Sequence, residues 1–209
     1  MHGFGTNIVT ADLTEYWSEL GYHKFGLCFI HEPNLAYVPI PKNASSFTTS
    51  KLIDLGWQAN NFSNNISILD QFKFLVILRD PIDRWLSGIN QYFLLYHKNI
   101  SQLSTDTLDL IAHKIVLDDH TEKQIYFCNQ LNLDKTIFFK FGPNLNNSLT
   151  DFLSKYYTNA IFNFQKEINN LTLIQKQLKS KLDTKLKDRL YSFYWQDYEL
   201  INKVNFYNA

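Results

Sequence analysis

The chain has 209 residues, of which 45% are hydrophobic and 16% aromatic, a composition typical of a globular protein with a buried core. Lysine plus arginine and aspartate plus glutamate number 20 each, so the formal net charge is zero. This balance excludes the general basic field of a nucleic-acid-binding protein, and any anion site must be built locally.

The sequence lacks the patterns of a secreted, membrane-spanning or zinc-binding protein. Its two cysteines, Cys28 and Cys128, lie in apolar runs without zinc-site spacing, which favours buried free thiols in a reducing compartment. The N-terminus has no basic-then-apolar leader, and no run approaches the ~20 apolar residues that span a bilayer. We therefore expect a cytoplasmic protein without an integral membrane segment, and interpret the Asn-x-Ser/Thr triplets as chance.

The first half of the chain alternates predicted helices and strands. Apolar runs bounded by turn residues indicate strands, and amphipathic stretches that follow a capping residue indicate helices. Turn residues at 31–34 make a hairpin of the first two strands one interpretation. The expected order is a short helix over 10–17 within an N-terminal arm (1–24), strands over 25–30 and 35–40, a helix over 47–55, a loop over 60–65, a strand over 72–78 and a helix over 82–96.

The run Phe72–Leu78 is the most convincing strand, because it is continuously apolar, as expected for a strand buried on both faces of a parallel sheet. Strand, helix, strand, helix in this order predicts an α/β fold with a parallel sheet flanked by helices. Functional groups in such folds gather at the carboxyl ends of the strands. Lys42 and Arg79 both follow predicted strands and are expected at these ends.

The second half is predicted to be mainly helical. No internal repeat, low-complexity tract or linker is found, so residues 1–209 are expected to form a single domain. The expected elements are helices over 107–116 and 122–130, a strand over 136–141, a helix opening at 147, a less certain polar stretch over 169–181 and a long amphipathic helix over 183–204.

The loop after the second strand, Pro41–Ser46, has the chemistry of a phosphate or sulfate site. Lys42 supplies an ammonium group, Ala44 lets the backbone approach an anion, and Ser45 and Ser46 donate hydrogen bonds at a helix start. The Walker pattern Gly-x-x-x-x-Gly-Lys-Ser/Thr is absent, which disfavours a magnesium-dependent nucleotide triphosphatase. An ordinary helix cap after a strand remains the alternative for this loop.

A second candidate loop begins at Arg79, directly after the strand over 72–78. Ser87 follows eight positions later, so that a guanidinium and a hydroxyl group can converge on one anion if Ser87 faces the strand end. Asp80 and Arg84 have the spacing of an intrahelical ion pair, and we expect structural roles for both.

The two loops together resemble those of the sulfotransferases. Pro41–Ser46 is similar to the family's 5′-phosphosulfate loop (Lys-x-Gly/Ala-Thr/Ser-Thr/Ser), and Arg79–Ser87 is similar to its 3′-phosphate motif (Arg-Asp-Pro-x-x-Arg-x-x-Ser). The segment Tyr194–Tyr198 resembles the aromatic-x-x-Asp-Tyr ending of the carbohydrate and membrane-associated branches. The family's late Arg-Lys-Gly segment is not found, which favours the carbohydrate-type branch and leaves the adenine contacts unassigned.

The resemblance implies a P-loop-like fold and 3′-phosphoadenosine 5′-phosphosulfate (PAPS) as sulfuryl donor, with adenosine 3′,5′-bisphosphate (PAP) as product and no metal. The departures are mild: Ala44 stands for the commoner glycine, and two serines stand for threonines. The implied donor contacts are the side chains of Lys42, Ser45 and Ser46 and the backbone N–H groups of Asn43, Ala44 and Phe47 at the 5′-phosphosulfate, and Arg79 and Ser87 at the 3′-phosphate.

His120 is the first candidate for the general base that activates the acceptor hydroxyl. It lies in Asp118–Gln124, which resembles the Asp-x-His-x-x-x-Gln segment of some carbohydrate sulfotransferases. The alternative is that Asp119 or Thr121 caps a helix and His120 is merely exposed. The other candidates are His97, Asp54 and Glu122, whereas His23 and His31 are expected to be hairpin or surface residues.

Three functions therefore stay open at the level of sequence. The leading one is a sulfotransferase that acts on a hydroxyl acceptor, with a saccharide favoured over a small phenol. The others are a nucleotide or nucleoside kinase on a related fold, and a non-catalytic domain that binds a phosphorylated ligand. The expected partners are thus a nucleotide donor and a hydroxyl acceptor, with no nucleic acid.

Overall fold

The computed structural model describes residues 27–31, 34–61, 70–97, 102–158, 161–162 and 172–208. The N-terminal arm and the short helix expected over 10–17 lie outside the described residues. The chain divides into two compact units. We call them the helical unit (1–22, 82–122 and 169–195) and the sheet unit (23–81, 123–168 and 196–209). The single domain over residues 1–209 stays a prediction.

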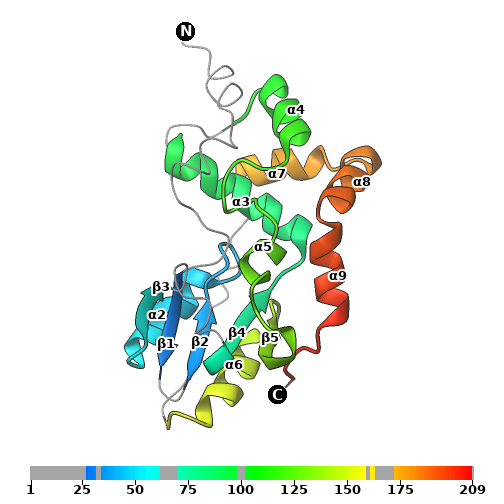
Figure 1. Ribbon diagram of the computed structural model, residues 1–209. Helices are drawn as coiled ribbons and strands as arrows, with labels where there is room; N and C mark the ends of the chain where they lie inside the picture. The colour runs from blue at the N-terminus through cyan, green and yellow to red at the C-terminus, as the bar shows by residue number, and fades with distance from the viewer. Residues whose placement is uncertain are drawn as a thin grey trace. The chain divides into compact units, whose positions relative to one another are not determined.

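The sheet unit contains a five-stranded sheet in the order β3-β1-β2-β4-β5 (Figure 1). Strands β2, β4 and β5 run parallel to one another, while β1 is antiparallel to both β2 and β3. The α/β class is confirmed, and the parallel sheet that was predicted is found for β2, β4 and β5, whereas the antiparallel β1 and β3 make the whole sheet mixed. The strands are β1 (Leu27–His31), β2 (Leu35–Val38), β3 (Gln58–Asn61), β4 (Lys73–Leu78) and β5 (Thr136–Lys140).

Two local features explain the antiparallel half of the sheet. The register pairs His31 with Leu35, so the connection is far too short for a parallel crossover, and Asn34 adopts the left-handed φ of 57°. The hairpin interpretation is thereby confirmed. Strand β3 was predicted to be partly a loop, because its sequence Gln-Ala-Asn-Asn lacks apolar alternation. Its pairing with β1 makes it a strand.

Helices cover both faces of the sheet. Alternate side chains of β4 enter different cores: Phe74, Val76 and Leu78 lie in a cluster with Leu200, while Leu75 and Ile77 lie with residues such as Leu52. This confirms the prediction that the strand is buried on both faces. The first core lies under α5 (Ile125–Cys128) and α9 (Trp195–Lys203), and the second under α2 (Ser45–Asp54) and α6 (Leu145–Ser154), with a short 3-10 helix η2 (Leu133–Lys135) before β5.

Both cysteines are buried and free, as predicted, and they share the core beneath α5 and α9. Burial raises the pKa of the Cys28 thiol to about 12, and burial, followed by the nearby Asp197 charge, raises the pKa of Cys128 further. Both thiols therefore stay protonated at neutral pH and behave as small apolar side chains.

The helical unit contains α3 (Pro81–Tyr96), whose first residue belongs to the sheet unit, with α4 (Thr105–Lys114), α7 (Leu173–Ser180) and α8 (Thr184–Phe193). Side chains of Ser104, Thr172 and Asp183 cap the starts of α4, α7 and α8. No helix among the described residues is both long enough and apolar enough to cross a membrane.

Two predicted helices differ from those observed. The long helix expected over 183–204 is two helices, α8 and α9, because Tyr194 leaves helical geometry (φ −91°, ψ 18°). Its buried hydroxyl donates to the carbonyl of Thr121, which anchors the break. The helix expected over 122–130 is only α5, four residues long. The Asp197 carboxylate accepts the N–H groups at its start and fixes where it begins.

Candidate functional site

The loop after β2 has an unusual backbone. Lys42 and Ala44 both adopt left-handed conformations, with φ of 67° and 60°. Each such residue other than glycine costs about 1 kcal/mol or more, and such conformations cluster at binding and active sites. The position of Ala44 is therefore one where a small side chain or glycine is favoured, for a reason of backbone geometry in addition to close approach.

Helix α2 starts directly from this loop and has no side-chain cap. Its N-cap is Ala44, whose carbonyl accepts the N–H of Thr48 at 3.0 Å. A helix leaves its first N–H groups without acceptors, and its N-terminus carries a partial positive charge. Ser46 is exposed and Ser45 is partly exposed. The N–H of Asn43 donates to the carbonyl of Ile40 at 3.2 Å, so a ligand would have to compete with that bond.

Arg79 lies beside this loop. It follows β4, the parallel neighbour of β2, and its guanidinium donates to the carbonyl of Lys42 at 3.0 Å. The same guanidinium lies 4.6 Å above the ring centre of Phe141. The prediction that Lys42 and Arg79 follow the carboxyl ends of strands is confirmed, and these strands, β2 and β4, prove to be parallel neighbours in the sheet unit. The two cations thus occupy one edge of the sheet, where an anion is favoured.

A buried amide network joins these two loops to a third segment. Asn43 and Gln124 are 0% and 1% exposed. The Asn43 Nδ2 group donates to the carbonyl of Ile77 at 2.7 Å and to Gln124 Oε1 at 2.6 Å. Gln124 Oε1 also accepts the N–H of Arg79 at 3.0 Å, and Gln124 Nε2 donates to the carbonyl of Arg79 at 2.8 Å. The backbone of Arg79 is therefore held on both its polar groups.

The network continues to α9. Asp197 is 0% exposed, and its two carboxylate oxygens accept the N–H groups of Gln124 at 2.9 Å and Ile125 at 2.8 Å. Sequence analysis had given Gln124 and Asp197 no role beyond their places in two motifs. Their function in the fold is to connect segments that are 45 to 81 residues apart along the chain.

His120 lies in a tight turn of the helical unit. Its ring Nδ1 is 2.8 Å from Asp118 Oδ2 and 3.1 Å from Asp119 Oδ1. Its backbone N–H donates to Asp118 Oδ1 at 3.0 Å. Burial by itself would lower the pKa of His120, but the hydrogen bonds and charges of the two aspartates outweigh it and raise the pKa to about 9. The imidazole is therefore mostly protonated at neutral pH.

Helix α3 holds this turn in place. Arg84 is 1% exposed and donates to the carbonyls of Asp119 (2.8 Å) and Glu122. The Trp85 indole donates to the carbonyl of Ile115 at 2.8 Å. A Cβ added to Gly88 would lie 2.3 Å from the carbonyl oxygen of His120, so only glycine fits there. Arg84 thus has a structural role, as expected, and it acts as a buried clamp on two backbone carbonyls.

The predicted residues fall into two groups. Lys42, Asn43, Ala44, Ser45 and Arg79 lie together in the sheet unit, as do Ser46 and Phe47 in the first turn of α2. Ser87, on α3, and His120 belong to the helical unit, where Gly88, the neighbour of Ser87, contacts His120. The convergence of Ser87 with Arg79 stays a prediction.

The alternative bases have other surroundings. Asp54 is exposed and pairs loosely with Lys51 at 3.9 Å. His97 lies against the rings of Tyr92 and Phe93, and burial lowers its pKa. The third alternative, Glu122, gives its carbonyl to Arg84. His31, expected in a hairpin or at the surface, ends β1 and contacts Trp57 and Tyr157, and His23 lies outside the described residues.

The His120 turn is also the group of described residues closest to a metal-binding arrangement. Ligand atoms of Asp118, Asp119 and His120 lie within 4.8 Å of one another. However, the Nδ1 proton is what both carboxylates accept, so this nitrogen is not offered to a cation. The geometry fits a protonated histidine better than a metal centre.

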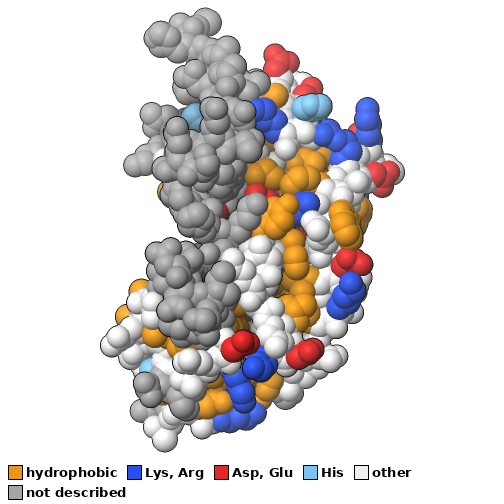
Figure 2. All heavy atoms as spheres, in the orientation of Figure 1, with side chains coloured by type: hydrophobic (Ala, Val, Ile, Leu, Met, Phe, Trp, Pro, Cys, Tyr) orange, Lys and Arg blue, Asp and Glu red, His pale blue; other side chains and the backbone are white. Residues whose placement is uncertain are grey.

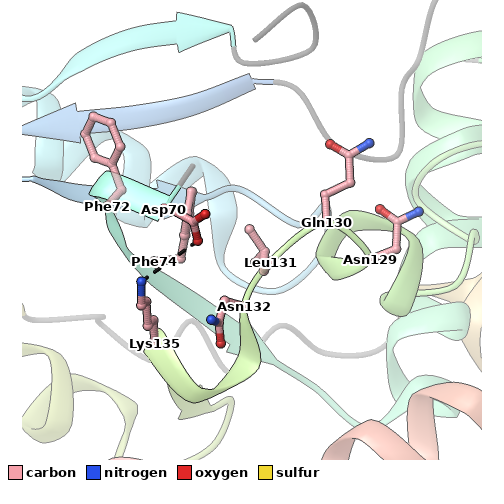
Figure 3. A pocket seen from close by; sticks show the side chains of 8 residues that line it. All are labelled: Asp70, Phe72, Phe74, Asn129, Gln130, Leu131, Asn132 and Lys135. Atoms are coloured by element: carbon pink, nitrogen blue, oxygen red, sulfur yellow. Dashed lines mark ion pairs between the residues drawn. The ribbon is translucent and has the colours of Figure 1, made fainter. Parts of the chain in front are cut away.

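A pocket of about 380 Å³ lies at the other end of the strands (Figure 3). Its lining includes Asp70 and Phe72 before β4 and Lys135 before β5, with Asp70 and Lys135 paired at 3.9 Å. The lining reaches Phe74 in β4, which lies five residues before Arg79, or about 17 Å at 3.3 Å per residue. The pocket is therefore distinct from the Lys42 and Arg79 loops. Figure 2 shows basic and acidic side chains interspersed on the visible face, in keeping with zero net charge.

Comparison of the chain with protein-family models, with curated proteins and with solved structures found no match. The sequence motifs and the geometry of the two loops are thus the grounds on which a function is proposed.

Proposed function

We propose that the protein is a sulfotransferase that transfers the sulfuryl group of PAPS to a hydroxyl group, with a saccharide as the favoured acceptor. The observation that carries the proposal is the contact between the two motif loops. Arg79 donates to the carbonyl of Lys42 at the ends of adjacent parallel strands. A ligand with one phosphate at each loop would match this pair of cations.

The proposed chemistry follows the logic of phosphoryl transfer. The acceptor oxygen forms a bond to sulfur as the bond from sulfur to the 5′-phosphate oxygen breaks, and PAP leaves. Negative charge grows on the leaving phosphate. The Lys42 ammonium and the uncapped N-terminus of α2 would stabilise that charge, with Ser45 and Ser46 as further donors. Arg79 and Ser87 would bind the 3′-phosphate.

His120 is the proposed general base. Its Nδ1 is engaged by Asp118 and Asp119, which leaves Nε2 to accept the proton of the acceptor hydroxyl. A histidine oriented by a carboxylate is a common base in nucleophilic catalysis. The raised pKa makes the base strong once neutral, but keeps it mostly protonated at pH 7.

Nucleotide binding tests the proposal most directly. We expect PAP to raise the melting temperature and ATP to have little effect, whereas a kinase would show the reverse. Arg79→Ala should weaken PAP binding by about a hundredfold, since a charge-assisted contact with the 3′-phosphate would be lost. Arg189→Ala, in the helical unit, is the matched control. If neither PAP nor ATP changes the melting temperature, both the sulfotransferase and the kinase function are wrong.

Transfer itself is measured with PAPS carrying labelled sulfate and a panel of glycans and phenols. Incorporation into a glycan is the expected result. Binding of PAP without transfer to any acceptor in the panel would favour the non-catalytic alternative.

A further inference from the structure

Gln124 is the point at which the Lys42 and Arg79 loops are joined. Its side chain is 1% exposed and makes three hydrogen bonds, one to Asn43 and two to the backbone of Arg79. Asn43 lies directly between the two left-handed residues of the first loop. One carboxamide therefore bonds to both loops at once.

Each polar atom of this carboxamide has a distinct task. Oε1 accepts from both loops, from Asn43 Nδ2 and from the N–H of Arg79. Nε2 donates to the carbonyl of Arg79. Glutamine satisfies both requirements, whereas glutamate has the same shape but only acceptors when ionised. The position thus demands a neutral amide.

The backbone of Gln124 is fixed independently of its side chain. The buried Asp197 carboxylate accepts the N–H groups of Gln124 and Ile125, so α9 anchors the start of α5. A carboxylate that accepts two backbone N–H groups holds a segment more firmly than a neutral acceptor would. The Gln124 amide therefore cannot shift easily to follow either loop.

We propose that Gln124 is a positioning residue that sets the separation of the two anion-binding loops, so that the protein selects ligands with two phosphate groups over those with one. This inference rests on the proposed function for the identity of the ligand, but not for the connection itself. Gln124 acts through the backbones of Arg79 and Asn43 and does not touch the ligand.

The test is Gln124→Glu, which preserves shape and removes the donor. At pH 8 we expect the affinity for PAP to fall about tenfold, since a buried carbonyl loses its hydrogen bond, while the affinity for adenosine 5′-monophosphate changes less than about threefold. Both are measured by calorimetric titration. Lowering the pH toward about 5.5 should restore PAP binding relative to wild type, because a buried glutamic acid protonates readily and then donates again.

Gln130→Glu is the matched control, since Gln130 is exposed and lies just beyond α5. It should leave both affinities unchanged at every pH. Equal losses for the two nucleotides in Gln124→Glu, or no recovery at low pH, would show a merely structural role and overturn the proposal.

Amide NMR spectra without ligand separate this inference from the proposed function. We expect Gln124→Glu to shift the resonances of residues 42–45 and 79–80 together, and Gln130→Glu to shift neither set. If these shifts appear but the wild-type protein binds no nucleotide, the proposed sulfotransferase function is wrong, while the link between the two loops through Gln124 is supported. If the wild-type protein binds PAP and Gln124→Glu binds it equally well, the positioning role of Gln124 is wrong, while the proposed function is supported.

Discussion

The Lys42 loop and the His120 turn are built in opposite ways. The loop has two left-handed residues and leads into a helix without a side-chain cap, so strained backbone and a helix N-terminus come together there. The turn is held by Arg84, by the hydroxyl of Thr121 and by two aspartates on one imidazole. A strained loop that leads into a helix N-terminus is suited to receive an anion, and a turn held by several hydrogen bonds is suited to orient one side chain.

The largest effect is expected at the loop. Lys42→Ala should lower the transfer rate at least about a hundredfold, because removal of one group that stabilises the leaving charge costs this much in other enzymes. The melting temperature should change little, since Lys42 is partly exposed. Lys51→Ala, which removes another partly exposed lysine, on α2, should transfer sulfate within about twofold of wild type. Equal rates from both variants would show that the loop is only a connection.

The next effect is expected at the turn. Arg84→Met keeps the buried stem of the side chain but leaves the carbonyls of Asp119 and Glu122 without their donor. We expect a loss of about 3 kcal/mol in the free energy of unfolding, or about 6–12 °C in melting temperature. Arg189→Met, which removes one bond to the carbonyl of His113 at the surface, should cost less than about 1 kcal/mol. Similar losses in both would contradict a clamp at Arg84.

The pH dependence of transfer tests the role of His120. With a pKa of about 9, roughly one molecule in a hundred carries a neutral imidazole at pH 7. The rate should therefore rise about tenfold per pH unit below the pKa and level off near pH 9. His120→Gln should be slow and independent of pH over this range. A wild-type rate that is flat between pH 7 and 9 would exclude His120 as the base.

The raised pKa of His120 also predicts that the stability of the protein falls with rising pH, whereas the transfer rate rises. The folded state binds the proton of His120 more tightly than the unfolded state, whose pKa is near 6.5. The stabilisation is fully present below about pH 6.5 and is lost as the pH rises through about 9. The free energies of unfolding of the wild-type protein and His120→Gln, measured in urea, should therefore become similar at high pH. Their transfer rates should instead differ most at high pH.

The sequence predicts the elements that depend on local patterns and misses those that depend on distant contacts. The strands β2, β4 and β5 follow from apolar runs, and so do the positions of Lys42 and Arg79 after strand ends, whereas the pairing of β2 with β4 is known only from the structure. Strand β3 has no apolar pattern and exists through its pairing with β1. The break between α8 and α9 depends on a bond from Tyr194 to Thr121, 73 residues away. Local propensity does not contain such contacts.

The residues of the candidate site also fall into those that the sequence reveals and those that only the structure reveals. Charged and hydroxyl side chains at strand ends are visible in sequence, because their chemistry is unusual at those positions. The roles of Gln124 and Asp197 arise from buried hydrogen bonds that span 45 to 81 residues of chain, and a glutamine or aspartate in an amphipathic segment gives no local sign of them. The left-handed φ of Ala44 was equally hidden, since alanine is not a residue that usually adopts it.

The smallest expected effect returns to the backbone of the loop. Ala44→Gly should raise the free energy of unfolding by about 0.5 kcal/mol, because relief of the left-handed alanine slightly exceeds the entropy cost of glycine. Ala112→Gly, inside α4, should instead lower it by about 1 kcal/mol. Urea unfolding distinguishes the two signs. If both variants lose stability equally, Ala44 is not left-handed in solution, and the loop would no longer differ from an ordinary helix start.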